Sequence, residues 1–193
     1  MSPVSFEAAS DAVRARLGKR GADHCERVAA TAADLASTYG VDVEQARLAG
    51  VLHDWDRDRP RDQLAAAALG EGLDVTSADE AVPYLLHART GAAGIAEAFP
   101  GISVDVVQSV ARHTVGAPDM TPLDEVIYLA DMMEPARDFT GVDDLRSAAG
   151  KVPLSELFAM GYQLSLMRLV RRRRPIHPET LDVWNKLVVG EKQ

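Results

Sequence analysis

Apolar residues recur along this chain with the three- and four-residue spacing of α-helices. Between residues 22 and 39, for example, Cys25, Ala29, Ala32 and Ala36 fall on one face of a helix. Alanine and leucine are abundant, and no long stretch alternates apolar and polar residues as a half-exposed strand would. The pattern therefore predicts an all-α fold.

Glycines, prolines and capping residues divide this pattern into separate helices. Gly18 and Gly40 end the first two helices, Asp42 caps the third, and Thr121 opens a later one with a capping box. The segment 70–80 reads as a loop. We expect a short helix that begins at Pro60, and further helices over 4–17, 22–39, 43–54, 83–98, 103–115, 122–134, 153–173 and 178–189.

No repeat, low-complexity linker or domain boundary interrupts these elements. We therefore expect one domain over 1–193, with a core at about 20–140 and C-terminal helices at about 150–190. At 47% hydrophobic the chain can bury a full core, but its longest apolar run, 64–69, is too short for a membrane span of ~20 residues. A single cysteine and the lack of a secretory signal predict a cytoplasmic protein.

Charge is acidic overall and uneven along the chain. The net charge is −8; residues 151–193 hold eight Lys/Arg and four Asp/Glu, a net of +4, which leaves −12 for residues 1–150. Nucleic-acid binding needs a basic surface, so no nucleic-acid partner and no membrane partner are expected. An acidic main body suits multivalent cations instead.

Four of the five histidines and two aspartates are candidate metal ligands. Each lies in or beside a predicted helix and is framed by small or apolar residues. Neutral imidazole together with carboxylate suits a first-row transition ion such as iron or manganese. Helical folds build metal centres from ligands on separate helices, so the set favours a metal site although each residue alone is weak evidence. The candidates are His24, His53, Asp54, His87, His113 and Asp131.

The order of these residues resembles that of the HD-domain superfamily of metal-dependent phosphohydrolases. The segments 85–87, 113–116, 130–137 and 176–180 more closely resemble one bacterial branch, the HD-domain symmetrical bis(5′-nucleosyl)-tetraphosphatases, which cleave diadenosine tetraphosphate to two ADP. The resemblance covers roughly residues 20–190. Its most specific part is the Glu-Pro-x-Arg sequence that follows Asp131.

The chain departs from this branch at two places. Trp55, Asp56 and Arg57 stand where the family often has a small residue followed by lysine, and Val115 replaces the second threonine of a His-Thr-Thr-Gly sequence. These departures affect the residues expected beside the phosphates and leave the metal set complete.

The resemblance implies an HD-domain helical bundle around a dinuclear metal site. Iron is the implied metal, in two ions, with manganese or another divalent transition metal as alternatives. His24, His53, Asp54 and Asp131 would hold one ion, and Asp54 would bridge to a second that His87 and His113 help to hold. His53, Asp54 and Asp131 are then the catalytic residues, since two cations lower the pKa of water from ~15.7 toward neutrality and generate the hydroxide that attacks a β-phosphorus.

Residues next to the ligands are expected to bind phosphate. Arg27 lies three residues after His24 on the same helix face, and Arg137 offers a planar fork for bidentate phosphate contact. The resemblance assigns both arginines to nucleotide binding. The remaining expected substrate contacts are His87, His113 and Thr114.

Four other features have no expected catalytic role. Cys25 points about 100° away from His24 on the helix and is expected to fill buried space. The run Arg171–Arg174 complements the helix dipole or reaches toward phosphates or a partner, and His177 opens the last helix. Glu134 either supports a metal ligand or pairs with Arg137.

The expected partners are a dinucleoside polyphosphate substrate and its product ADP, and a homodimer is left open. Two other functions are left open as well. One is another HD nucleotide phosphohydrolase, acting on a deoxynucleotide or on guanosine tetraphosphate, which the Glu134–Arg137 sequence disfavours. The other is a non-catalytic nucleotide sensor, which the complete ligand set disfavours.

Overall fold

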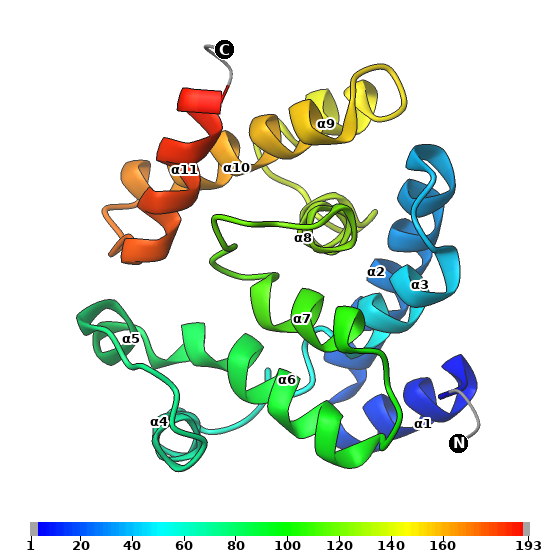
Figure 1. Cartoon of the computed structure of the whole chain (residues 1–193), viewed down its shortest axis with the longest axis vertical. Helices are drawn as coiled ribbons and strands as arrows, with labels where there is room; N and C mark the ends of the chain where they lie inside the picture. Colours follow the sequence, from blue (N-terminus) through cyan, green and yellow to red (C-terminus); the bar gives the residue numbers. More distant parts are fainter. Residues whose placement is uncertain (1–3, 191–193) are drawn as a thin grey trace.

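The computed structural model describes residues 4–190, and within that range every regular element is a helix (Figure 1). This confirms the predicted all-α class. The elements are α1 (Phe6–Arg16), α2 (Lys19–Tyr39), α3 (Val43–Leu52), α4 (Arg61–Gly70), α5 (Ser77–Ala81), the 3-10 helix η1 (Pro83–Leu86), α6 (His87–Ala98), α7 (Val104–Arg112), α8 (Pro122–Met133), α9 (Val142–Ala148), α10 (Leu154–Arg171) and α11 (Pro178–Gly190).

Several sequence-based expectations about the helices were wrong. The expected loop at 70–80 contains α5, because Thr76 and Asp79 cap each other's backbone and stabilise one helical turn. The expected helix at 83–98 is divided into η1 and α6. Helix α9 was not expected, and it begins after Gly141, whose φ of 94° only glycine adopts easily.

The third helix also ends earlier than expected, and this matters for the site. α3 stops at Leu52, so that His53 caps it and Asp54 lies in the following turn. A continuing helix would point these neighbouring side chains about 100° apart. The turn instead allows both to face the same interior space.

Helix α8 lies at the centre of the molecule. Figure 1 views it end-on, with α2 and α3 to its right, α9 above it, and α10 and α11 to its upper left. Nine of its twelve residues are buried, as expected for a helix surrounded by others. Its N-terminus carries the capping box expected from the sequence, formed by Thr121 and Asp124.

The contact between α2 and α3 depends on one glycine. A Cβ at Gly50 would lie 2.7 Å from the Cα of Ala29, too close for any side chain. Gly50 therefore lets the two helix backbones touch, which sets His53 at the end of α3 against α2. No helix in the part of the chain that the structure describes is long and apolar enough to cross a membrane.

Candidate metal centre

The six candidate ligands come from five helices and meet in the interior. His24 lies on α2, His53 and Asp54 follow α3, His87 begins α6, His113 caps α7 and Asp131 lies on α8. The four histidines and Asp54 are buried, and Asp131 is partly exposed. The sequence expectation that these six residues lie together agrees with the geometry, although residues 24 and 131 are more than a hundred positions apart.

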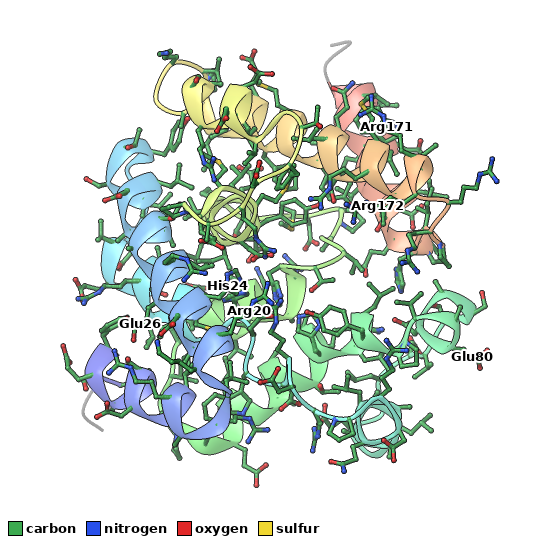
Figure 2. The ribbon with its side chains drawn as sticks, turned by 180° about the vertical axis from the view of Figure 1, so that it is seen from behind. Arg20, His24, Glu26, Glu80, Arg171 and Arg172 are labelled. Carbon is green, nitrogen blue, oxygen red and sulfur yellow. The ribbon has the colours of Figure 1, made fainter. Side chains whose placement is uncertain are left out.

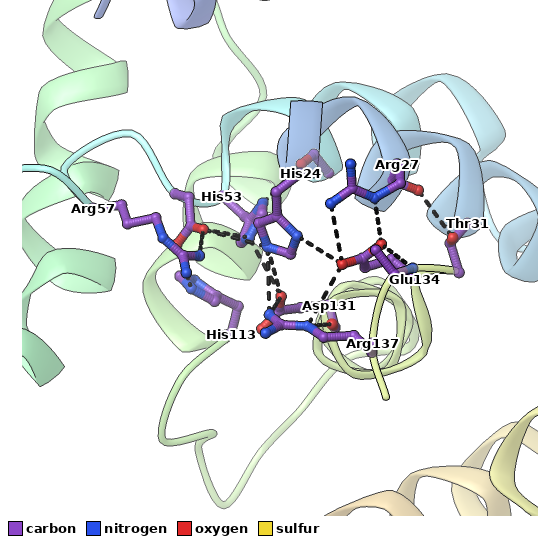
Figure 3. Close-up of polar contacts among 12 residues, drawn as sticks. His24, Arg27, Thr31, His53, Arg57, His113, Asp131, Glu134 and Arg137 are labelled. Atoms are coloured by element: carbon purple, nitrogen blue, oxygen red, sulfur yellow. Dashed lines mark hydrogen bonds and ion pairs between the residues drawn. The ribbon is translucent and has the colours of Figure 1, made fainter. Parts of the chain in front are cut away.

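The carboxylate of Asp54 lies between two pairs of histidines (Figure 3 draws part of this group). Its Oδ2 is 3.2 Å from Nε2 of His53 and 3.5 Å from Nε2 of His24. Its Oδ1 is 3.2 Å from Nε2 of His87 and 3.8 Å from Nε2 of His113. Each oxygen thus faces a different pair of histidines, so Asp54 could contribute a donor atom on both sides.

Asp131 completes the pair on the His24 side. Its Oδ1 lies 2.9 Å from Nε2 of His24 and 3.8 Å from Nε2 of His53. Two groups of donors result, His24 with His53 and Asp131, and Asp54 with His87 and His113, each with its donor atoms within 4.8 Å of one another.

All four imidazoles bind an acceptor through Nδ1. In His53, His87 and His113 this nitrogen lies 2.6–2.8 Å from the backbone carbonyl three residues earlier. In His24 it lies 3.2 Å from a carboxylate oxygen of Glu134. Since Nδ1 must carry the proton to donate these bonds, Nε2 of a neutral ring presents its lone pair to the centre.

These inward nitrogens fit metal ions better than they fit one another. Nε2 of His53 is buried and has no hydrogen-bond partner. Nε2 of His87 lies 3.1 Å from Nε2 of His113, where two lone pairs repel. Cations held by the two donor groups would satisfy these three atoms, and a set of imidazoles and carboxylates suits a divalent transition metal.

The electrostatics of the group keep the carboxylates anionic and His113 neutral, whereas the charge of Asp54 raises the pKa of His53 well above its usual value. Burial lowers the pKa of His113 to about 3, and the charges of His53 and His87 act in the same direction. Burial alone would raise the pKa of Asp54 and of Asp131, but the neighbouring histidines hold both pKa values well below the usual range. The carboxylates are therefore anionic and His113 is neutral.

Three arginines surround the ligands (Figure 3). Arg57 donates to Asp54, and Arg137 donates to Asp131. Arg27 donates from Nε to Glu134 at 2.5 Å. Arg27 and Arg137 were expected beside the ligands. Arg57 was not, since it stands where the chain departs from the family pattern.

The contacts of Glu134 bear on the two roles expected for it, support of a metal ligand and pairing with Arg137. It accepts from Nδ1 of His24, so it supports a candidate ligand from behind. It also pairs closely with Arg27, while Nε of Arg137 lies farther away at 3.9 Å. Such partners orient metal-binding imidazoles and raise their basicity.

A cavity of about 240 Å³ opens directly onto the candidate ligands. Thr114 lines it, as expected for a substrate contact, and its hydroxyl lies 3.1 Å from Nε2 of His113. Tyr84 and Arg168 also line it, and neither residue carried a local sequence signal. They enter the site only because η1 packs against α6 and α10 packs against α8.

Cys25, His177 and the arginines at the end of α10, for which no catalytic role was expected, lie in three different places. Cys25 is fully buried as expected, but its sulfur also lies within 4.8 Å of donor atoms of His53 and Asp54. His177 pairs with Asp79 at 3.3 Å. Arg171 and Arg172 lie beyond Arg168 at the end of α10, where they line a small recess.

The whole chain was compared with known protein families, sequences and solved structures. The HD domain family matches residues 21–136. A protein of Halalkalibacterium halodurans named symmetrical bis(5′-nucleosyl)-tetraphosphatase is 33% identical over 93% of this chain and 95% of its own. A protein of the same name from Bacillus subtilis is 31% identical over 97% of this chain and 100% of its own. A crystal structure from Clostridium acetobutylicum, described as a predicted HD superfamily hydrolase involved in NAD metabolism, superposes with a TM-score of 0.89 at 32% identity, covering 98% of this chain and 100% of that one.

Proposed function

The chain belongs to the HD domain family and, within it, to the symmetrical bis(5′-nucleosyl)-tetraphosphatases, and from this premise we propose that it hydrolyses diadenosine tetraphosphate to two ADP. The family membership and the geometry of the site both support a metal-dependent phosphohydrolase. The relatives' name supports the particular substrate. The symmetrical product is our proposal.

One observation supports metal-dependent phosphoryl hydrolysis as the reaction class. Four imidazole nitrogens and two carboxylates converge with their lone pairs toward a common centre, and arginines stand next to them. When bound, a pair of divalent ions supplies an activated water and offsets charge on the transferred phosphoryl group. We propose two iron ions, because imidazole and carboxylate donors suit iron, and manganese has the same preference.

The chain's own residues would position the phosphates. Arg57 and Arg137 each donate to a candidate ligand, so each can turn its remaining donors toward a phosphate oxygen beside the metals. Thr114 offers a hydroxyl on the opposite side of Asp54, next to His113. Phosphoryl transfer depends mainly on such positioning and on charge neutralisation, so no separate protein nucleophile is needed.

In the proposed reaction, the oxygen of water forms a bond to one β-phosphorus. The bond between that phosphorus and the oxygen that bridges the two middle phosphates breaks. The second ADP leaves with the bridging oxygen, and the proton lost by water passes to solvent. Arg57 and Arg137 would offset the charge that develops on the leaving phosphate.

The test is product analysis. Protein purified without oxygen and loaded with iron is incubated with diadenosine tetraphosphate in water enriched in heavy oxygen, and the nucleotides are separated. We expect ADP alone, with the label on the β-phosphate of half of it. Equal amounts of ATP and AMP would overturn the symmetrical assignment even if the metal centre were present.

The cellular compartment is a further part of the proposal. The single thiol, Cys25, is buried and free, which supports a reducing cytoplasm. Fractionation of cells that express a tagged chain tests this directly.

A further inference from the structure

Two hydrogen bonds join the C-terminal helices to segments that lie beside the candidate metal centre. One runs from His177, which directly precedes α11, to Asp79 on α5, and Figure 1 shows α5 and the start of α11 next to each other. The other runs from Tyr162 on α10 to the backbone carbonyl of Val115. Both donors lie outside the range 21–136 that matches the HD domain family.

His177 differs from the four histidines of the centre in the ring nitrogen that carries its proton. The backbone N–H of Glu179 donates to Nδ1 of His177 at 3.2 Å, so this nitrogen has no proton. Nε2 then carries the proton and donates to Oδ2 of Asp79 at 3.3 Å. In the histidines of the centre Nδ1 donates instead. His177 is therefore arranged to link two segments, not to ligate a metal.

Asp79 connects this link to His87 from both sides along the chain. Asp79 is fully buried, and its Oδ2 also accepts from the backbone of Thr76 and lies 2.8 Å from the guanidinium of Arg89. Arg89 lies two residues after His87 on α6. Before His87, α5 packs against η1, and Tyr84 of η1 stacks on the His87 ring with centroids 4.4 Å apart. A shift of Asp79 would therefore move the surroundings of this imidazole.

Tyr162 makes the corresponding link to His113. Its ring is buried, and its hydroxyl oxygen lies 2.6 Å from the carbonyl oxygen of Val115 and 3.4 Å from that of Thr180. The single hydroxyl proton is donated over the shorter distance. Val115 lies two residues after His113, and a Cβ on the following Gly116 would lie 3.1 Å from the Tyr162 ring. Tyr162 therefore holds the backbone that leaves His113.

The other group of donors is held from within the matched range. The partners of His24, His53 and Asp131 are Glu134, the carbonyl of Gly50 and Arg137, respectively. All three partners lie within residues 50–137, so these bonds need neither α10 nor α11. The ion beside this group is called the first ion here, and the ion beside Asp54, His87 and His113 the second. The two C-terminal links act on the second.

We propose that His177 and Tyr162 are positioning residues for the second ion. This rests on the proposed function, in which the centre contains two ions. The two bonds fix the segments that aim His87 and His113, and neither donor lines the cavity of about 240 Å³ in which a substrate would meet these ligands. Loss of either bond should weaken the second ion and leave the first.

Calorimetric titration of the metal-free protein with Mn²⁺ tests the proposal without turnover. We expect two ions per chain in the unmodified protein. His177→Ala and Tyr162→Phe should each weaken the second ion about 10-fold and the first less than twofold. This is the low end of the ~10–100-fold contribution of groups that orient a ligand directly, because here each acts through another residue. His177→Gln should recover part of the affinity, because its amide can still donate to Asp79.

Two controls match these variants. Tyr39→Phe removes a hydroxyl that also bonds to the backbone, at the N–H of Gly150, but lies at the end of α2 fifteen residues from His24. Asp79→Asn alters the acceptor of the His177 link and should weaken the second ion. Glu80→Gln removes the same charge at the exposed neighbour on α5, which Figure 2 shows at the edge of the molecule, and should not.

Kinetics give a second measurement. At limiting Mn²⁺, kcat for diadenosine tetraphosphate should fall in His177→Ala with the occupancy of the second ion, and excess Mn²⁺ should restore it. KM should change less than twofold, because His177 does not line the cavity. Circular dichroism checks that each variant folds. If His177→Ala fails to fold, His177→Gln and Tyr162→Phe carry the test, since both keep most of the side-chain volume.

The outcomes separate this proposal from the proposed function. Cleavage of diadenosine tetraphosphate, with unchanged Mn²⁺ binding in the His177 and Tyr162 variants, overturns the proposal alone. An equal weakening of both ions, or the same loss in Tyr39→Phe, also overturns it. A protein that does not cleave this substrate, but loses only its second ion in these variants, overturns the proposed function and supports the positioning role.

Discussion

The bonds at Nδ1 explain how four histidines are held in fixed orientations in the interior. Three of them return to the carbonyl three residues earlier, which is a local bond that any histidine at a helix start or end can make. The fourth, from His24 to Glu134, joins residues 110 positions apart. Both kinds of bond fix the ring and aim Nε2 at the same centre.

Arg137 belongs to the substrate side of this centre. Arg137→Ala should lower kcat/KM for diadenosine tetraphosphate roughly 10- to 150-fold, since a charge-assisted hydrogen bond contributes about 1.5–3 kcal/mol. Metal per chain should stay near that of the unmodified protein, because a guanidinium does not ligate a cation. Steady-state kinetics and metal analysis of the same samples measure both.

Arg137→Lys serves as the conservative variant. It should recover part of the activity, because lysine keeps the charge and loses the planar fork. Unchanged kinetics in both variants would return Arg137 to a structural ion pair with Asp131 and would contradict its role at the substrate.

At the scale of elements, the position of α3 depends on its contact with α2. Gly50→Ala would place a Cβ 2.7 Å from the backbone of Ala29, and His53 lies one turn later at the end of the same helix. We expect a loss of about 1–3 kcal/mol in the free energy of unfolding, together with lower metal content. Denaturant unfolding and metal analysis measure the two effects.

Gly70→Ala is the matched control. Gly70 also lies near the end of a helix, but an added Cβ meets nothing within 4 Å there. This variant should be neutral or more stable by about 0.4–1 kcal/mol, because alanine restricts the unfolded chain. A Gly50→Ala protein as stable and as metal-rich as Gly70→Ala would show that α2 and α3 tolerate separation.

Helix α8 carries a carboxyl group that makes stability depend on pH. Burial, and then the charge of Asp124, raise the pKa of Glu125 from 4.5 to about 7. Between these values the folded protein retains a proton that the unfolded chain has released. The free energy of unfolding therefore contains a contribution that is fully present below pH 4.5 and is lost as the pH rises through about 7.

Glu125→Gln should remove this dependence. Relative to the variant, the unmodified protein should lose about 1–2 kcal/mol of stability between pH 5 and pH 8, a value reduced because Glu125 is only partly buried. Urea unfolding at the two pH values measures it, and Glu156→Gln, at an exposed position nearby, is the control. Equal pH profiles for Glu125→Gln and the unmodified protein would mean that Glu125 is solvated.

At the scale of the whole molecule, the candidate ligands join α2, α3, α6, α7 and α8. A metal that binds only the folded state stabilises it by about 2.7 kcal/mol at a free concentration of 100 Kd. For a chain of this size we expect removal of the metal by a chelator to lower Tm by about 5–10 °C. Calorimetry with and without added metal measures this shift.

Asp54→Asn tests whether the shift comes from this site. The variant should bind less metal, and its Tm should respond little to either metal or chelator. Asp62→Asn removes the same charge from an exposed position on α4 and should keep the full shift. A metal-dependent Tm that survives in Asp54→Asn would place the ion elsewhere.

Much of the fold and of the candidate site is predictable from local sequence. Helix periodicity predicts the all-α class, and caps such as Thr121 and Asp42 predict where helices begin, because both effects act over a few residues. The six candidate ligands are recognisable because their order and their neighbours form short motifs. The short helices α5 and α9 escaped prediction since their apolar pattern is too brief to detect.

The grouping of those residues required the tertiary structure. Three features of the site join segments that are distant in sequence. They are the way the two oxygens of Asp54 face different histidines, the bond from His24 to Glu134, and the position of Arg168 in the cavity wall. No periodicity relates such segments. Their contact depends on how α2, α3, α8 and α10 pack, and that packing is set by the shape of many buried side chains at once.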